Sequence, residues 1–238
     1  MKPAWITAAA LAALMAAPTM ADELVIKPAL GYAAALEALR AGYESATGDK
    51  ITIAGANDTA DLLIVAKQQV EAQIKEGKMD AAGVADIAEM RVGFAVKAGA
   101  PKPDISTPEK LKAVLLAAKS VGVSRFVSGQ FVSGELFPQL GIADQMKDKT
   151  VFVANGPVGE AVAKGEAEVG FQQMSELLPI KGLSVVGPIP DSLQRATILT
   201  AGLTPGTKAH AAGARFIAYV KSPAVAAAYK SMDLKPVK

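Results

Sequence analysis

The sequence predicts an α/β fold in which mostly parallel strands are connected by helices. Short apolar runs such as ELVIK (23–27), KITIAG (50–55) and TVFVA (150–154) have the length and the β-branched content of strands. Longer segments with apolar residues at three- and four-residue spacing, such as 30–48 and 106–119, are typical of helices. Because strands and helices alternate along the chain, we expect helical crossovers between parallel strands.

The elements can be placed in order along the chain. Strands are expected at 23–27, 50–55, 61–66, 91–101, 120–124, 150–154, 167–173, 184–190 and 195–203. Helices are expected at 30–48, 67–77, 106–119, about 133–146, 155–166, 208–222 and 223–232. Leu36, Leu39 and Tyr43 lie on one face of the first helix. Ser106 and Glu109 have the spacing of a capping box at the start of the third.

The amino-terminal segment has the pattern of a cleaved secretory signal. Lys2 precedes an apolar run (6–17), which is followed by Pro18 and by small residues up to Ala21. The run is shorter than the roughly 20 residues that span a bilayer, which disfavours a membrane anchor. We therefore expect a periplasmic protein whose signal peptide, residues 1–21, is removed so that Asp22 begins the mature chain.

Composition excludes several functional classes. The chain has no cysteine, so it can form no disulfide and cannot carry a lipid on an amino-terminal cysteine. It has one histidine, so no cysteine–histidine metal cluster is possible, and we expect neither a metal nor another cofactor. The formal charge of +2 falls to about +1 when Lys2 is removed, which gives no basis for binding nucleic acid or a membrane surface.

The stretch FVSGQFVSGE (126–135) contains FVSG twice. A five-residue spacing would place the two serines about 140° apart on a helix and on opposite faces of a strand. We therefore expect Ser128 in a loop and Ser133 as the cap of the helix that follows. Ser133 and Gly134 would then let an anion approach the helix start, where amide groups and the helix dipole favour negative charge.

Three loops follow strands and can contribute to one ligand site: 55–61, 124–134 and 155–159. Ligands of open parallel sheets sit beyond the carboxyl ends of the strands. The residues expected at the site from the first and third loops are Asn57, Gly156, Pro157 and Val158. Taken alone, each feature can also be an ordinary cap or turn.

The sequence does not favour an enzyme. It contains no G-x-S-x-G, no P-loop and no G-x-G-x-x-G motif. His210 lies in a segment expected to be a surface helix, where a solvated role is the simpler interpretation. Spacing alone leaves a serine–lysine nucleophile open, and we expect binding rather than catalysis.

Three longer segments, 92–121, 133–150 and 156–194, resemble the molybdate-binding-like branch of the class II periplasmic solute-binding proteins of ABC importers. The third is the most specific, with a short helix, the sequence GEAEVG and a Ser-Glu pair. The resemblance runs from about residue 23 to the end. It implies two α/β lobes that are joined by two hinge strands and close on a ligand. Lobe one would be 22–91 plus 196–238, and lobe two 92–195.

Two departures from that family bear on the ligand. About fifteen residues of the usual pattern, a serine-rich turn and helix, are missing between 50–55 and 61–66. The tyrosine that contacts molybdate in the family is Gln173 here. Both differences disfavour molybdate. Arg125, at the carboxyl end of the strand 120–124, offers a planar fork that suits a carboxylate, although it can also be a surface residue paired with an acid.

The resemblance implies an exported receptor that captures a small anion, either an organic carboxylate or an oxyanion. Its partners would be that ligand and the membrane permease of an ABC importer, and we expect a monomer. A sensor, a scavenger or a degenerate binder of the same fold remains an alternative.

Overall fold

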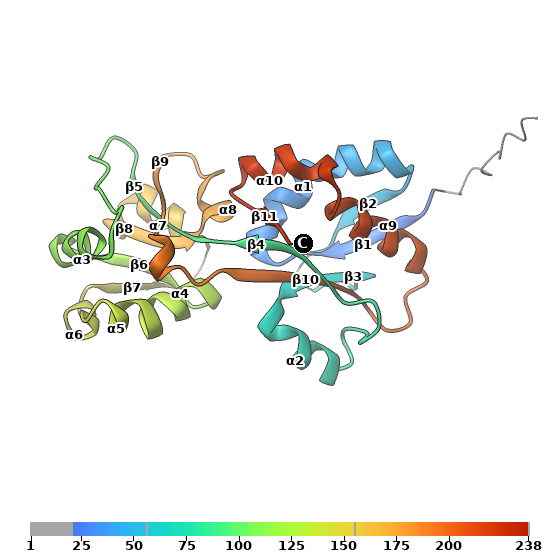
Figure 1. Ribbon diagram of the computed structural model, residues 1–238, viewed down its shortest axis with the longest axis horizontal. Helices are drawn as coiled ribbons and strands as arrows, with labels where there is room; N and C mark the ends of the chain where they lie inside the picture. Colours follow the sequence, from blue (N-terminus) through green and yellow to red (C-terminus); the bar gives the residue numbers. More distant parts are fainter. Residues whose placement is uncertain (1–20, 56, 155, 238) are drawn as a thin grey trace, which may run out of the picture.

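The computed structural model describes residues 21–55, 57–154 and 156–237, and two β-sheets lie side by side in it (Figure 1). The lobe-one sheet has six strands in the order β11-β4-β10-β3-β1-β2, and the lobe-two sheet has five in the order β7-β6-β8-β5-β9. The predicted signal segment lies outside the described residues except for Ala21. No helix of the described chain has both the length and the apolar character needed to cross a membrane.

Lobe one combines strands from the two ends of the chain. Its strands are β1 (Glu23–Lys27), β2 (Lys50–Ile53), β3 (Leu62–Ala66), β4 (Ala85–Met90), β10 (Thr197–Leu203) and β11 (Lys235–Pro236). Its helices are α1 (Leu30–Thr47), η1 (Lys67–Gln69), α2 (Val70–Lys75), α9 (His210–Val220), η4 (Pro223–Val225) and α10 (Ala226–Ser231).

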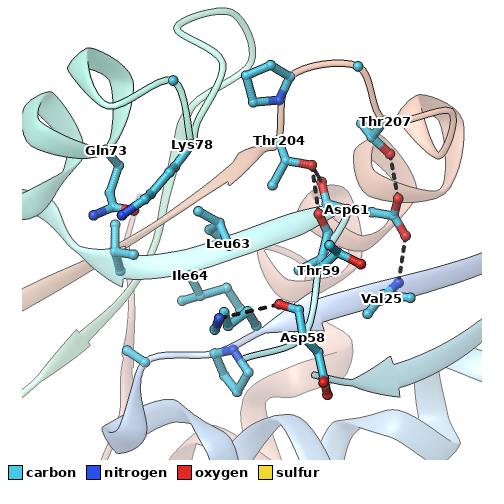
Figure 2. Close-up of a pocket in the computed structure, with 18 of the residues that line it drawn as sticks. Val25, Asp58, Thr59, Asp61, Leu63, Ile64, Gln73, Lys78, Thr204 and Thr207 are labelled. Atoms are coloured by element: carbon cyan, nitrogen blue, oxygen red, sulfur yellow. Dashed lines mark hydrogen bonds between the residues drawn. The ribbon is translucent and has the colours of Figure 1, made fainter. Parts of the chain in front are cut away.

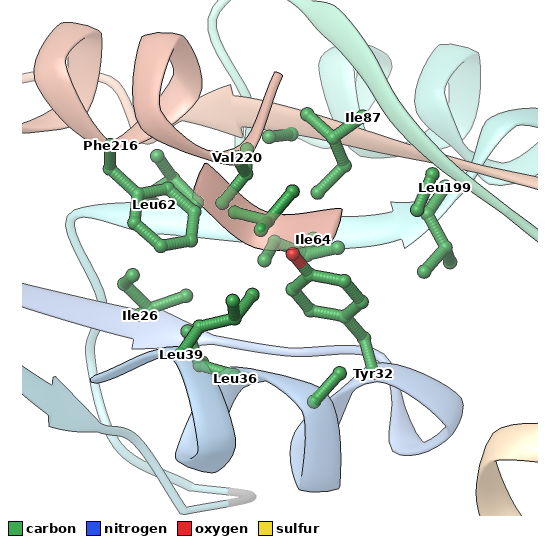
Figure 3. Packing of buried hydrophobic residues seen from close by; sticks show 14 of the residues in the cluster. Ile26, Tyr32, Leu36, Leu39, Leu62, Ile64, Ile87, Leu199, Phe216 and Val220 are labelled. Atoms are coloured by element: carbon green, nitrogen blue, oxygen red, sulfur yellow. The ribbon is translucent and has the colours of Figure 1, made fainter. Parts of the chain in front are cut away.

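The core of lobe one lies between its sheet and the helices α1, α9 and α10 (Figure 3). Helix α1 contributes Tyr32, Leu36, Leu39 and Tyr43, whose four-, three- and four-residue spacing places them on one buried face. Burying each such apolar side chain contributes about 1.5–3 kcal/mol. The helix ends at Gly48, which adopts the left-handed conformation (φ 81°) that favours glycine.

Lobe two is continuous in sequence. Its strands are β5 (Val92–Lys97), β6 (Val121–Ser124), β7 (Thr150–Val153), β8 (Val169–Gln173) and β9 (Leu183–Pro188). Its helices are α3 (Pro108–Ala117), α4 (Val127–Phe131), the π-helical turn η2 (Val132–Leu136), α5 (Phe137–Gln139), α6 (Ala143–Met146), α7 (Val158–Lys164), α8 (Met174–Leu177) and η3 (Asp191–Leu193). In its main core the rings of Phe94 and Phe171 pack edge to face, with 4.9 Å between the ring centroids.

Two crossovers join the lobes (Figure 1). The first passes through Arg91, between β4 and β5, and the second leads from β9 to β10. The Gln194 side chain holds the crossovers together, because it accepts from the Val92 amide (2.8 Å) and donates to the Val92 carbonyl (2.9 Å). Arg91 also forms two hydrogen bonds to Asp233, near the end of the chain.

The predicted two-lobe α/β fold is confirmed, and three details were wrong. The sheets are mixed rather than mostly parallel, because β10 runs antiparallel to β3 and β4, and β5 runs antiparallel to β8 and β9. Strands β4 and β11 were not predicted. Helix α3 is capped by Thr107, which accepts from the Lys110 amide, and not by Ser106. The lobe boundaries stay a prediction, with which the strand membership of the two sheets agrees.

Candidate functional site

Two glutamines at the carboxyl end of β8 contact α7 and the second crossover. Gln172 Oε1 accepts a hydrogen bond from the Gly159 amide in the first turn of α7 (3.1 Å). Gln173 Nε2 donates to Thr197 Oγ1 at the start of β10 (3.1 Å). Neighbouring side chains of a strand point to opposite faces, so one strand end reaches both partners. The end of β8 is therefore the place where lobe two meets the strand that returns to lobe one.

Gln173 has an unsatisfied polar atom. Its side chain is 3% exposed, and its Oε1 has no hydrogen-bond partner among the described residues. Leaving a buried polar group unpaired costs about 1–3 kcal/mol. Because the Thr197 hydroxyl can donate as well as accept, a half-turn of the amide would expose Nε2 in place of Oε1. In either orientation, Gln173 offers one amide group to a ligand or a water molecule.

A helical run from Val127 to Gln139, made of α4, η2 and α5, begins beside this strand end. Its N-cap, Phe126, provides no side-chain hydrogen bond, and the first amides of a helix have no partner within the helix. The Ser124 hydroxyl accepts from the amides of Phe126 (3.3 Å) and Gly129 (3.2 Å) and lies 3.3 Å from the Ser128 hydroxyl. A Cβ on Gly129 would lie 1.8 Å from the Ser124 carbonyl oxygen, so this close approach requires glycine.

The start of this helical run corrects the prediction for Ser133 and Gly134. The helix begins at the first FVSG repeat, so Ser133 lies inside it and does not cap it. Its hydroxyl donates to the Gly129 carbonyl (2.9 Å), the usual local bond of a helical serine. Val132, Leu136 and Leu140 are apolar at four-residue spacing, which is the helical signal that the sequence contained, and the structure buries all three.

Helix α7 begins where the sequence predicted a turn and a helix. Gly156 has a positive φ of 78°, and Pro157 is the N-cap, without a side-chain bond. The Val158 side chain is fully buried, so it can contact a ligand only through its backbone. Gly159 lies so close to Ile180 that a Cβ would be 2.5 Å from it. Ligand contact by this turn remains a prediction.

Glu176 was not among the residues predicted at the site. A Cβ on Gly31, in the first turn of α1, would lie 3.3 Å from Glu176 Oε1, so this carboxyl of lobe two faces a helix start of lobe one. The Glu176 carboxyl also accepts a hydrogen bond from Gln172 Nε2. Burial raises the pKa of Glu176, and the bond from Gln172 opposes that shift only in part. The Ser-Glu pair of the third resembling segment was the signal available in the sequence.

A small hollow lies between the lobes. We call it the interlobe hollow; its volume is about 120 Å³, and Gln68 of lobe one, Ser128 and Phe131 of the helical run, and Arg195 and Thr197 of the crossover are part of its lining. The hollow is smaller than the roughly 300 Å³ at which typical ligand pockets begin. It would therefore be one part of a ligand site.

A larger hollow of about 800 Å³ lies on lobe one (Figure 2). Leu63 and Val65 line it on the sheet face opposite the main core, and Pro28 and Ala29 line it just before α1. Only eight residues (54–61) separate β2 from β3, so no helix follows β2. The short connection that the sequence indicated thus coincides with an open sheet face. Asn57 is exposed on this connection and lines neither hollow.

Asp61 holds one wall of the larger hollow in place. Its carboxylate accepts from the Val25 amide (3.0 Å) and from the Thr207 hydroxyl (2.6 Å), both shown in Figure 2. Both oxygens are thereby used within the fold. Lys78 and Gln73 supply polar groups on the opposite wall.

A family model described as bacterial extracellular solute-binding protein matches residues 25–232. The chain belongs to this family. Among characterised proteins, this solute-binding protein is similar to an aconitate isomerase from Pseudomonas sp, with 33% identity over 211 residues that cover 82% of this chain and 80% of that protein. The family places the protein outside the cytoplasm.

Solved structures show the same two-lobe fold. The periplasmic molybdate-binding protein of Azotobacter vinelandii superposes with a TM-score of 0.73 at 16% identity, over 90% of this chain and 100% of the other. The substrate-binding domain of a putative molybdenum ABC transporter from Clostridium difficile gives 0.71 at 20% identity, over 92% and 100%. The solute-binding protein therefore has the molybdate-binding-like fold that its sequence resembles.

Arg125 of the solute-binding protein is exposed just after β6. Its guanidinium lies over the Phe152 ring, 5.4 Å from the centroid, and no carboxylate of the described chain lies within ion-pair distance of it. The alternative of a surface arginine paired with a nearby acid is therefore not observed. Contact with a ligand remains a prediction for this residue.

Within the ranges that the structure describes, no three side chains of histidine, cysteine, aspartate or glutamate are grouped so that they could hold a metal ion. The polar groups around β8 are amides, hydroxyls and one carboxyl, which suit hydrogen bonding to a small polar molecule.

Proposed function

We propose that this solute-binding protein captures a small organic carboxylate between its lobes in the periplasm and presents it to the membrane permease of an ABC importer. The observation that carries the proposal is the start of the Val127–Gln139 helical run at the interlobe hollow, where Ser124 caps the Gly129 amide but Phe126 offers no side-chain acceptor to the amides of Val127 and Ser128. Free amides at a helix start favour an anion. Ser128, Gln173 and Thr197 would add neutral donors.

Two features favour a carboxylate over a tetrahedral metal oxyanion. Arg125 lies over Phe152 and has no carboxylate partner within the described residues, and its guanidinium offers two parallel donors that suit a carboxylate. The larger hollow beside the start of α1 leaves room for a molecule larger than an oxyanion. The relative with 33% identity is named for aconitate, a tricarboxylate, which makes tricarboxylates the first ligands to test.

A thermal-shift and calorimetry panel tests the proposal. We would compare cis-aconitate, trans-aconitate, citrate and malate with molybdate, a neutral sugar and a cationic amine. A ligand at 100 times its Kd should stabilise the protein by about 2.7 kcal/mol, a Tm rise of roughly 5–10 °C for a chain of this length. The proposal fails if the sugar or the amine raises the Tm and no carboxylate does. Nanomolar binding of molybdate would show that the ligand class is wrong.

The transport role has its own test, because a sensor or scavenger would share the cleft and dock elsewhere. Neighbouring genes for a permease and an ATPase would support import, whereas a neighbouring sensor kinase would support signalling. Deletion of the gene should abolish uptake of the radiolabelled carboxylate if the protein serves an importer.

A second candidate is an isomerase that moves an allylic double bond in a tricarboxylate. It is favoured by the aconitate isomerase relative and by Glu176, a largely buried carboxyl with a raised pKa that faces the start of α1. Such a carboxylate would remove a proton from the methylene carbon, the double bond would shift, and a proton would return to the former vinyl carbon. Incubation with trans-aconitate in D₂O, followed by NMR, separates the candidates. A binding protein returns unchanged substrate, whereas an isomerase yields deuterated cis-aconitate and loses this activity in Glu176→Gln.

A further inference from the structure

An ion cluster around the buried carboxylate of Asp49 connects the beginning of the described chain to α9. Asp49, between α1 and β2, is completely buried, and its carboxylate receives two bonds from Arg215: Nε to Oδ2 (2.8 Å) and a terminal guanidinium nitrogen to Oδ1 (2.7 Å). The Tyr43 hydroxyl donates a third bond to Asp49 (2.7 Å). The same terminal nitrogen of Arg215 also reaches the Asp22 carboxylate (2.7 Å). In Figure 1, α9 and β2 lie beside the start of β1, where this cluster forms.

The formal charges of this cluster do not balance. Asp22 and Asp49 bring two negative charges, and Arg215 brings one positive charge. The neighbouring charged groups, Glu44 and Lys50, pair with each other at 2.9 Å and add no net charge. The cluster therefore has one negative charge in excess, and a positive charge placed next to buried Asp49 would be favourable.

The backbone nitrogen of Asp22 lies 3.2 Å from Asp49 Oδ1. In the unprocessed chain this nitrogen belongs to the Ala21–Asp22 peptide bond and is a neutral donor. Hydrolysis of that bond adds one water molecule: Ala21 leaves with a carboxylate, and Asp22 keeps an amine that takes up a proton. Ala21 is exposed, and β1 begins only at Glu23.

We infer that processing between Ala21 and Asp22 creates an α-ammonium group that pairs with buried Asp49 and completes the cluster of Asp22, Asp49 and Arg215. The amino-terminal charge of the mature protein is then a structural ion of lobe one, produced by the signal peptidase. Two independent observations meet at this bond: the small-residue cleavage pattern that ends at Ala21 and the hydrogen bond from the Asp22 nitrogen to buried Asp49. The inference does not depend on the ligand or on the proposed function.

The pKa of the new α-amino group reports the ion pair directly. Its ordinary value is about 7.7–8.0, and a buried carboxylate partner raises it. Hydrogen bonds from Arg215 are the largest cause that lowers the pKa of Asp49. Asp49 is therefore ionised over the pH range in which the α-amino group titrates. The stabilisation by a raised amine pKa is complete below the unfolded value and is lost as the pH rises through the folded value. The other titratable groups around this amine are Tyr43, whose pKa is raised by burial, and the Glu44–Lys50 pair.

The experiment compares two otherwise identical chains, one that begins at Asp22 and one that begins at Ala21. The second retains every side chain of the cluster but moves the ammonium group one residue, about 3.8 Å of chain, away. After ¹³C-dimethylation, NMR titration should give an α-amino pKa at least one unit higher in the Asp22-first protein, equal to about 1.4 kcal/mol. Its Tm should also be higher at pH 6.5, and the difference should vanish above pH 10.

Two controls make the comparison decisive. Asp49→Asn in the Asp22-first protein should return the α-amino pKa to that of the Ala21-first protein. If that variant does not fold, the two chain starts still test the inference, because neither removes a buried group. The intact mass of protein exported to the periplasm should correspond to a chain that starts at Asp22. A pKa difference below one unit, or a different mature terminus, overturns the inference.

Discussion

Ser128 and Ser133 occupy the same FVSG context, yet the helix that contains both gives them different environments. Ser128 is buried at the interlobe hollow, and Ser133 donates to a helical carbonyl. We expect Ser128→Ala to weaken carboxylate binding by roughly one to two orders of magnitude, because a hydrogen bond to a charged group contributes about 1.5–3 kcal/mol. Ser133→Ala should leave affinity unchanged and shift stability by less than about 0.5 kcal/mol. Titration calorimetry measures the affinity of both variants. Equal losses in Ser128→Ala and Ser133→Ala would contradict the placement of Ser128 alone at the ligand.

The Glu176 carboxyl should make the stability of the protein depend on pH. Burial raises its pKa, so folding favours the protonated form, and stability decreases as the pH rises from the unfolded value through the folded value. Glu176→Gln mimics the protonated carboxyl and can still accept from Gln172. It should raise the Tm at pH 8, and the gain should shrink as the pH falls toward 4. A lower Tm at pH 8 would instead show that the start of α1 stabilises the charged carboxylate.

Among the elements, the helical run Val127–Gln139 depends on one glycine and tolerates replacement of the other. A Cβ on Gly129 would lie 1.8 Å from the Ser124 carbonyl oxygen, whereas one on Gly134 would meet no atom within 4 Å. Gly129→Ala should destabilise the protein by at least about 1–3 kcal/mol. Gly134→Ala, the matched control, should stabilise it by up to about 1 kcal/mol through helix propensity. Urea unfolding measures both, and a neutral Gly129→Ala would contradict the close packing of α4 on β6.

The whole molecule consists of two lobes joined by two crossovers, with a proposed ligand contacting both. Closure on a ligand should reduce the radius of gyration in solution scattering, because the lobes approach each other about the crossovers. The Ser128→Ala protein at the same ligand concentration is the control and should stay closer to the unliganded value. The scattering mass also tests the predicted monomer. An unchanged radius at saturating ligand would argue against binding between the lobes.

Elements with local signals could be predicted from the order of the amino acids alone. The buried spacing of Tyr32, Leu36, Leu39 and Tyr43 and the terminal Gly48 define α1 without reference to the rest of the chain. The alternation of strands and helices, together with the resembling segments, was sufficient for the two-lobe fold. The helix predicted at 155–166 contains α7, whose N-cap is Pro157.

Contacts between residues far apart in the chain could be read from the three-dimensional structure but not from the sequence. The antiparallel placement of β10 beside β3 joins segments more than a hundred residues apart, and no local periodicity encodes that pairing. The same holds for Glu176 against the start of α1 and for Arg215 with Asp22 and Asp49. Ser128 was misplaced because a five-residue repeat has no preferred local conformation, and the contact of Gly129 with β6 sets the helix start. Local preference selects elements, whereas burial and charge pairing between distant segments select the site.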